Sequence, residues 1–189
     1  MKKHGFLLLA FAFISVLANA QNSSVYFNWT PTGTLLTSDG KDYVIKEYEG
    51  KSKEELYNEL LVSVSSLFND PKHVVSTVEN QLININAGQM VEWPYGGLLG
   101  IVPVNMQYVL KIHFKDNKIK IDAPYFTSIT VGGTPVYDIE GWAKAQKFFN
   151  PDGTFNTKKG KSIFCRGVNI AFNNLIEAIL SYNKTNNDW

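Results

Sequence analysis

Polar residues recur on three predicted strands and could form one binding surface. Apolar and polar residues alternate along residues 81–86, 108–115 and 118–123, the two-residue period of a half-buried strand. Because alternate residues share a face, the polar set is expected to point the same way. Its members are Asn84, Asn86, Lys111, His113, Lys118 and Lys120. Such a surface could hold an anionic glycan, a phosphate or an acidic partner protein. The pattern is more typical of a solvated face whose lysines prevent edge-to-edge aggregation, and this interpretation is the favoured one.

A second candidate is the aromatic segment VEWPYGGLLGIVP, residues 91–103. Its glycines and prolines predict an irregular stretch, and Trp93 and Tyr95 on such a loop could stack on sugar rings or anchor a partner. The apolar side chains beside them predict, with equal weight, a hydrophobic plug that closes the end of the core. The sequence leaves both interpretations open.

The sequence shows no catalytic constellation. It contains no Gly-x-Ser-x-Gly elbow, no His-Glu-x-x-His and no glycine-rich phosphate loop, so no cofactor is predicted. An enzyme would need carboxylates that the fold brings together, such as Asp122, Asp138 and Glu140, for a hydrolase acting on envelope or dietary glycans. Downstream of residue 20 the histidines are His73 and His113, without a metal-ligand spacing, so no metal site is predicted.

The single cysteine, Cys165, excludes an internal disulfide. Its neighbour Arg166 and its place near the start of a predicted helix could lower the pKa of the thiol. The adjacent Ile163 and Phe164 favour instead a small buried apolar residue.

Short sequence patterns predict the helices and the hairpin that would position these residues. Ser52 and Glu55 have the capping-box spacing, and Glu54 adds a second negative charge to the first helical turn. The charges of KSKEELYNELL therefore predict a helix start, followed by one broad apolar face up to Phe68. A second amphipathic helix is expected over residues 168–182, a short one over 139–149, and a hairpin with a two-residue turn at Asp116-Asn117.

Residues 1–20 have the pattern of a secretory signal peptide. Two lysines precede an apolar run over residues 6–17, and Ala18-Asn19-Ala20 predicts cleavage before Gln21. The protein is therefore expected to be periplasmic or secreted, and no later apolar run is expected to be long enough to span a membrane. The chain has 18 basic and 17 acidic side chains. This near-neutral balance gives no electrostatic bias toward nucleic acid.

Three stretches resemble a known family: EYEGKSKEELYNELLVSVSSLFNDPKHVV, LININAG and YVLKIHFKDNKIKI. They are similar to a bacterial exported domain of unknown function with a TBP-like fold, named after the TATA-binding protein. The resemblance implies an α+β domain over residues 21–189, with a curved antiparallel sheet and two main helices packed on one face. Residues 90–105 and 127–161 depart from the family pattern and are interpreted as expanded loops. The resemblance brings no catalytic residues.

Together these observations favour a non-catalytic module of the cell envelope that binds a glycan, a small ligand or an envelope protein. The glycan hydrolase is one alternative. The other is an envelope assembly subunit that uses the Trp93 segment or an edge of the sheet.

Overall fold

The computed structural model describes residues 25–95 and 100–181. The predicted signal peptide, residues 1–20, lies outside this part of the chain, as do Leu98, Leu99 and Tyr182. Two strands, β1 (Asn28–Trp29) and β2 (Leu35–Leu36), form a small hairpin near the N-terminus. The other strands form one antiparallel sheet: β3 (Tyr43–Glu47), β4 (Val75–Val78), β5 (Leu82–Pro94), β6 (Ile101–Lys115), β7 (Lys118–Asp122), β8 (Tyr125–Val131) and β9 (Thr134–Val136).

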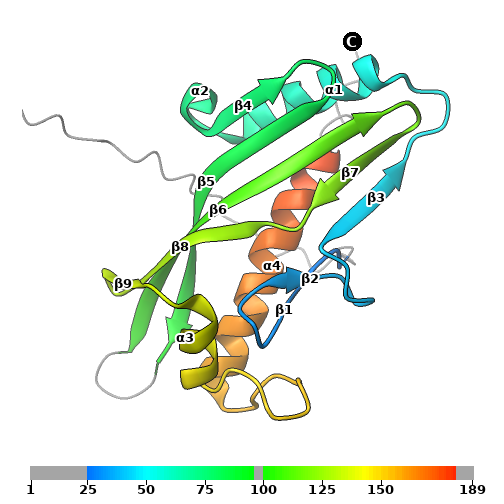
Figure 1. The fold of residues 1–189 in the computed structure, drawn as a ribbon. Helices are drawn as coiled ribbons and strands as arrows, with labels where there is room; N and C mark the ends of the chain where they lie inside the picture. Colours follow the sequence, from blue (N-terminus) through cyan, green and yellow to red (C-terminus); the bar gives the residue numbers. More distant parts are fainter. Residues whose placement is uncertain (1–24, 96–99, 182–189) are drawn as a thin grey trace, which may run out of the picture.

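The sheet forks along β6. On one side, β6 pairs with β5 from Ile101 to His113. On the other side, residues 112–115 of β6 pair with β7, whereas residues 104–109 pair with β8. The strand order is β3-β7-β6-β5-β4 at one end, and β8 followed by β9 branches from β6 at the other (Figure 1). Pro124 separates β7 from β8, and its missing N–H is consistent with a break in the ladder there.

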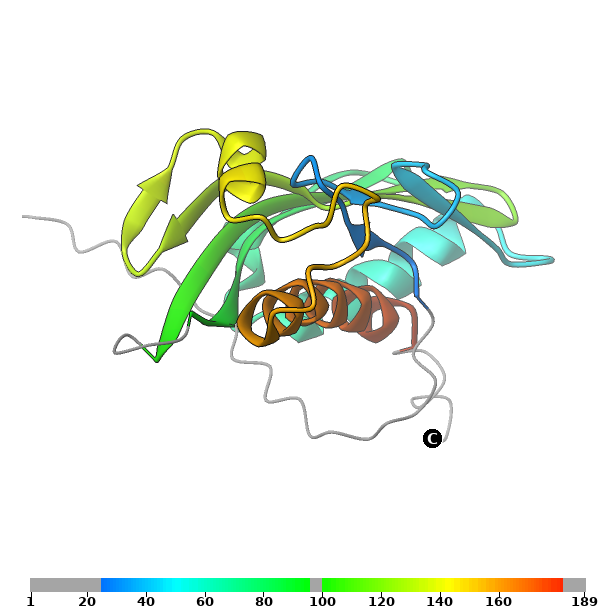
Figure 2. The same cartoon turned by 90° about the horizontal axis from the view of Figure 1, so that it is seen from below.

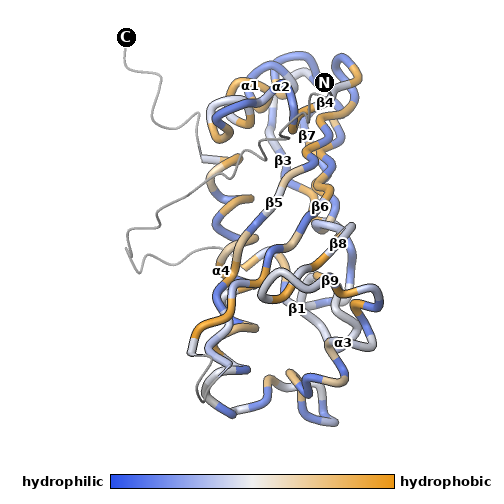
Figure 3. The backbone as a smooth tube through the Cα atoms, turned by 90° about the vertical axis from the view of Figure 1, so that its left-hand side faces the viewer, coloured by the Kyte–Doolittle hydropathy of each residue, from blue (hydrophilic) through white to orange (hydrophobic). Residues whose placement is uncertain are grey.

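Two long helices, α1 (Lys53–Leu67) and α4 (Lys159–Ser181), lie under one face of this sheet. Figure 2 shows the sheet arching over both of them. Hydrophilic and hydrophobic residues alternate along the strands (Figure 3), so that one set reaches the helices and the other remains outside. The core between the layers includes Leu56, Leu60, Ile85, Tyr108, Leu110, Ile112, Phe172 and Ile179. The protein therefore has the α+β architecture that the sequence predicts.

The capping box at the start of α1 is confirmed. Ser52 Oγ accepts a hydrogen bond from the Glu55 N–H at 3.2 Å, and a Glu55 carboxylate oxygen accepts one from the Ser52 N–H at 2.8 Å. The bond from the Ser52 N–H, and next the one that the Ser52 hydroxyl donates to the same carboxylate at 2.9 Å, hold the pKa of Glu55 below its ordinary value. The charged stretch KSKEELYNELL, residues 51–61, is therefore a helix start.

The predicted expanded loop at 90–105 is wrong for residues 90–94 and 101–105, which are strand. The pairing of β5 with β6 continues through Val91–Val104 and Trp93–Val102 to Pro94–Ile101. Pro94 and Pro103 lie near the ends of their strands, where a missing N–H costs least. The predicted loop at 127–161 is also structured: it holds most of β8, all of β9, α3 (Ile139–Ala145) and the first turn of α4.

Helix α4 begins at Lys159, earlier than the predicted residue 168. From Gly160 to Ser181 it is long and apolar enough to cross a membrane by length and hydropathy, contrary to the expectation that no such run exists. In this fold, however, its apolar stripe is used in the core: Val168, Phe172 and Ile179 are buried. A core helix of a globular protein meets the same criteria.

The N-terminal strap, residues 25–29, runs along α4. Asn173 accepts hydrogen bonds from the N–H groups of Tyr26 (2.7 Å) and Phe27 (2.9 Å) and donates one to the Phe27 carbonyl (2.8 Å). Asn169, one turn earlier, accepts a bond from the Trp29 N–H at 2.7 Å. The side chains of Phe27 and Trp29 are buried as a result.

Candidate functional site

The six polar residues of the predicted surface do share one face. Asn84 lies opposite Lys111, His113 opposite Lys120, and Lys118 opposite Lys115 in the antiparallel ladders. Directly paired residues project from the same side of a sheet. Their strand neighbours on the other side, Ile83, Ile112 and Ile121 among them, are buried toward the helices. The polar set therefore occupies the face opposite α1 and α4, here named the open face.

The open face is less basic than the six residues suggest, because Asp122 lies among them. One carboxylate oxygen of Asp122 is 2.8 Å from His113 Nε2, and the other is 2.7 Å from Lys120 Nζ. Burial alone would raise the pKa of Asp122, but the bonds from Lys120 and His113 outweigh it and hold that pKa below the ordinary value. Lys111 and Lys118 make no ion pair within the described part of the chain and keep their charge available.

We expect Asp122→Asn to lower the free energy of unfolding at neutral pH by less than about 1 kcal/mol, since the cluster is partly exposed. A carboxyl with a lowered pKa in the folded state stabilises the protein above its unfolded pKa, and this contribution disappears as the pH falls. The difference between wild type and variant should therefore shrink as the pH falls through 3.8 and below. Urea titrations between pH 3 and pH 7 measure it; a constant difference would contradict the ionic role of Asp122.

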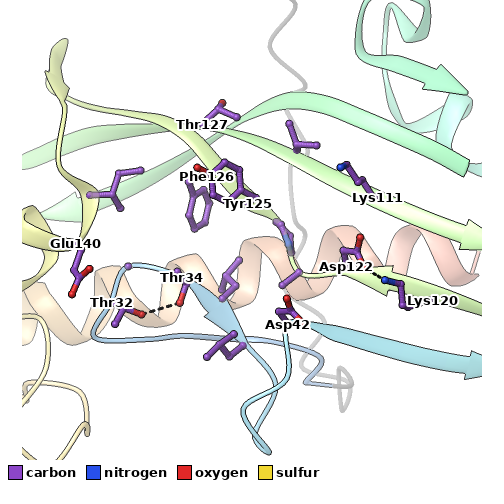
Figure 4. A pocket seen from close by; sticks show the side chains of 17 residues that line it. Thr32, Thr34, Asp42, Lys111, Lys120, Asp122, Tyr125, Phe126, Thr127 and Glu140 are labelled. Atoms are coloured by element: carbon purple, nitrogen blue, oxygen red, sulfur yellow. Dashed lines mark hydrogen bonds and ion pairs between the residues drawn. The ribbon is translucent and has the colours of Figure 1, made fainter.

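A groove of about 900 Å³ opens where β7 and β8 diverge. Figure 4 shows its side chains entering from the β1–β2 turn, the end of β7, the residue just before β3, the start of β8, the middle of β6 and the start of α3. We name it the fork groove. Its polar and aromatic lining comprises Thr32, Thr34, Asp42, Lys111, Lys120, Asp122, Tyr125, Phe126, Thr127 and Glu140.

The fork groove combines an apolar base with mixed charges. Leu35, Val109 and Ile139 supply apolar surface, and Tyr125 stands 70 % exposed at its centre. Lys111 and Lys120 of the predicted set line it. The other four members, Asn84, Asn86, His113 and Lys118, lie on the open face outside the lining.

The carboxylates proposed for a hydrolase are not brought together as an acid–base pair. Figure 4 places Glu140 and Asp122 at opposite ends of the fork groove. Asp138 is outside its lining and caps α3 by accepting a bond from the Gly141 N–H at 2.8 Å. A general acid of a glycosidase needs a raised pKa, whereas the pKa of Asp122 is lowered.

Trp93 and Tyr95 lie elsewhere, at the far end of β5. Nine residues of β5 separate Asn84 from Trp93, roughly 30 Å at the rise of an extended strand. Trp93 is only 4 % exposed and packs against Phe148, with ring centroids 5.2 Å apart, and against Phe164. Trp93 belongs to a strand and to the core, whereas Tyr95 is 53 % exposed. Of the apolar residues predicted to form a plug, Leu98 and Leu99 lie outside the described residues and Ile101 is exposed.

Cys165 is fully buried in α4. Burial, opposed only weakly by Arg166, raises the pKa of its thiol to about 12. At neutral pH the group is a protonated apolar side chain and not a nucleophile. Within residues 25–95 and 100–181, no three His, Cys, Asp or Glu side chains converge as a set of metal ligands.

The sequence signals for the fork groove were weak. Tyr125 follows Pro124 in a stretch without clear periodicity, and Thr32 and Thr34 belong to a turn that reads only as loop. No pattern in the sequence links these residues, because they meet only where β6 changes its partner.

Comparisons of the sequence with protein-family profiles and with curated proteins find no match. Solved structures do match. A DUF4468 family protein from Bacteroides ovatus ATCC 8483 superposes with a TM-score of 0.59 at 12 % identity, covering 78 % of this chain and 84 % of that one. A TBP-like protein from Parabacteroides distasonis ATCC 8503 gives 0.53 at 18 % identity, covering 76 % and 91 %. At these identities the likeness concerns the fold. The chain thus shares the TBP-like α+β fold of these domains of unknown function, as its sequence motifs indicate.

Proposed function

We propose that the protein is an exported, non-catalytic binding module of the cell envelope and that the fork groove is its ligand site. The observation that carries this proposal is the groove itself. Its volume of about 900 Å³ lies within the range of sites for small ligands, and apolar walls with a few convergent polar groups are the usual composition of such sites.

The ligand that we propose is a glycan carrying one anionic group, which would reach Lys111 in a lining that also holds the carboxylates of Asp42, Asp122 and Glu140. Tyr125 presents an exposed aromatic ring on which a sugar ring stacks through its apolar face. Lys111, which has no ion pair among the described residues, supplies a cation for a carboxylate, sulfate or phosphate group on that sugar. Asp42 and Glu140 accept hydrogen bonds from sugar hydroxyls, although Glu140 shares its charge with Lys144 at 2.5 Å.

Export is the other half of the proposal, and it rests on residues 1–20. Their charged start, apolar run and small-residue cleavage pattern would deliver the folded module to the periplasm or beyond. An envelope or secreted location would expose it to acidic polysaccharides.

A screen of acidic oligosaccharides, each with its neutral counterpart, tests the proposal on the chain from Gln21 onward. We expect binding of acidic members without turnover. Lys111→Gln should weaken it about tenfold, the cost of one charge-assisted hydrogen bond. Tyr125→Ala should weaken it about threefold to tenfold. Calorimetry supplies both values.

Lys118→Gln is the matched control, since Lys118 lies on the same face, likewise makes no ion pair with the described residues, and is outside the groove. Its affinity should remain that of wild type. An equal loss in Lys118→Gln would point to diffuse attraction by the open face and contradict the groove. Absence of binding across the screen, or release of cleaved product, would contradict the proposed function.

A further inference from the structure

A second hollow lies on the other side of the start of α3. It shares no lining residue with the fork groove, although Asp138 of the hollow directly precedes Ile139 and Glu140 of the groove. It has a volume of about 480 Å³ and is bounded by the end of β5, the β8–β9 hairpin and α3. Its described lining is aromatic and weakly polar: Trp93, Tyr95, Val131, Thr134, Pro135, Val136, Tyr137, Asp138, Trp142 and Gln146. We name it the aromatic hollow.

Three of its rings form a corner. The Tyr95 ring stands at 83° to Trp93 with centroids 4.8 Å apart, and the Trp142 ring stands at 86° to Trp93 with centroids 6.1 Å apart. Trp93 is nearly buried and forms the base, while Tyr95 is half exposed. Tyr137 adds a fourth ring that is 96 % exposed. Of these rings Tyr95 and Tyr137 remain exposed, so the hollow offers two water-accessible aromatic side chains to a ligand.

The charge of the aromatic hollow is of one sign. No lysine or arginine is among its described lining residues, and its one ionisable acid is Asp138. The nearby Lys144 pairs with Glu140 at 2.5 Å. The faces of aromatic rings are themselves electron-rich, so rings and carboxylate together attract positive charge. Such a site disfavours the anionic ligand proposed for the fork groove.

We propose that the aromatic hollow binds an organic cation of the methylated ammonium class. An alkylammonium group carries a positive charge spread over apolar methyl groups. The methyl groups contact the ring faces while the charge is attracted to both the rings and the carboxylate. The same chemistry is available from a free small molecule and from a methylated lysine side chain of a partner protein. This site is independent of the fork groove, and its ligand carries the opposite charge.

Choline and its uncharged isostere 3,3-dimethylbutan-1-ol form the sharpest pair of probes. NMR titration of the chain from Gln21 follows the indole N–H signals of the tryptophans. We expect choline to shift the Trp93 and Trp142 signals and to leave that of Trp29, outside the lining, unchanged. The neutral isostere should bind at least tenfold more weakly. A peptide with one trimethyllysine and its unmethylated form then distinguish a protein partner from a free ligand.

Asp138→Asn is the decisive variant. Asparagine caps a helix as well as aspartate does, so the bond to the Gly141 N–H is kept and only the charge is lost. We expect choline affinity to fall severalfold at an unchanged Tm. Tyr137→Leu and Tyr95→Leu, which keep apolar bulk without the ring, should each lower affinity about threefold to tenfold, and Tyr125→Ala in the fork groove should have no effect.

Three results would overturn the inference. They are equal binding of choline and its isostere, preferential binding of a neutral pyranoside such as methyl glucoside, and absence of shifts with every ammonium probe. None of them bears on the fork groove, whose own screen uses acidic sugars and other variants.

Discussion

Asn173→Ala is expected to lower the free energy of unfolding by about 3 kcal/mol, because it leaves buried backbone groups without hydrogen-bond partners. Asn173 is 5 % exposed and binds two N–H groups and one carbonyl of the N-terminal strap. The strap carries Phe27 and Trp29 into the core, so its loosening also exposes apolar surface.

Asn174→Ala is the matched control for this change. Asn174 is the next residue of α4, is half-buried and makes no side-chain hydrogen bond with the described residues. Both substitutions replace asparagine by the better helix former, so their difference isolates the strap contacts. Chemical denaturation measures both variants. Equal stability of the two would show that the strap contributes nothing to the fold.

Gly160→Ala is expected to be nearly as damaging, at about 2–3 kcal/mol. A Cβ at Gly160 would fall inside the contact radius of the Pro94 carbonyl oxygen, which is backbone and has no rotamer by which to yield. The end of β5 and the start of α4 would have to separate. The helix propensity gained by alanine, about 1 kcal/mol, offsets only part of this cost.

Gly167→Ala provides the comparison within the same helix. Its new Cβ would lie 3.0 Å from Val91 Cγ1, a side-chain methyl that moves by rotation. We expect a change in Tm of a few degrees at most, of either sign, against a loss of roughly 10 °C or more for Gly160→Ala. Similar Tm values for the two variants would show that α4 does not approach Pro94 closely.

Much of the fold is predictable because its signals are local. Ser52 and Glu55 satisfy each other's backbone within one turn, so the start of α1 requires no distant partner. The alternation in residues 108–121 determines which side chains face the helices. The residues between them point to the open face, because successive side chains of a strand lie on opposite sides. The resemblance in residues 47–75 adds the TBP-like fold, which the solved structures support.

Other features depended on contacts between distant segments. Gly and Pro near Trp93 predicted a loop, but pairing along the full length of β6 extends both strands through this region. The open face is less basic than the sequence predicts for a similar reason. Asp122 comes within reach of His113 and Lys120 only through the register of β6 and β7.

By itself the sequence determined the start of α1 and the two faces of the strands, and it predicts the signal for export, because each follows from neighbouring residues. The start of α4 at Lys159 was not among the features it determined. Only the tertiary structure decided at which residue β6 stops pairing with β7 and begins to pair with β8. This change of partner determines where Tyr125, Lys111 and Asp42 meet. The tertiary structure also decided that Trp93 forms the base of a hollow and does not stand on an exposed loop. The physical reason is that a periodic pattern specifies the face of a strand, whereas its partner and register follow from the packing of the whole core.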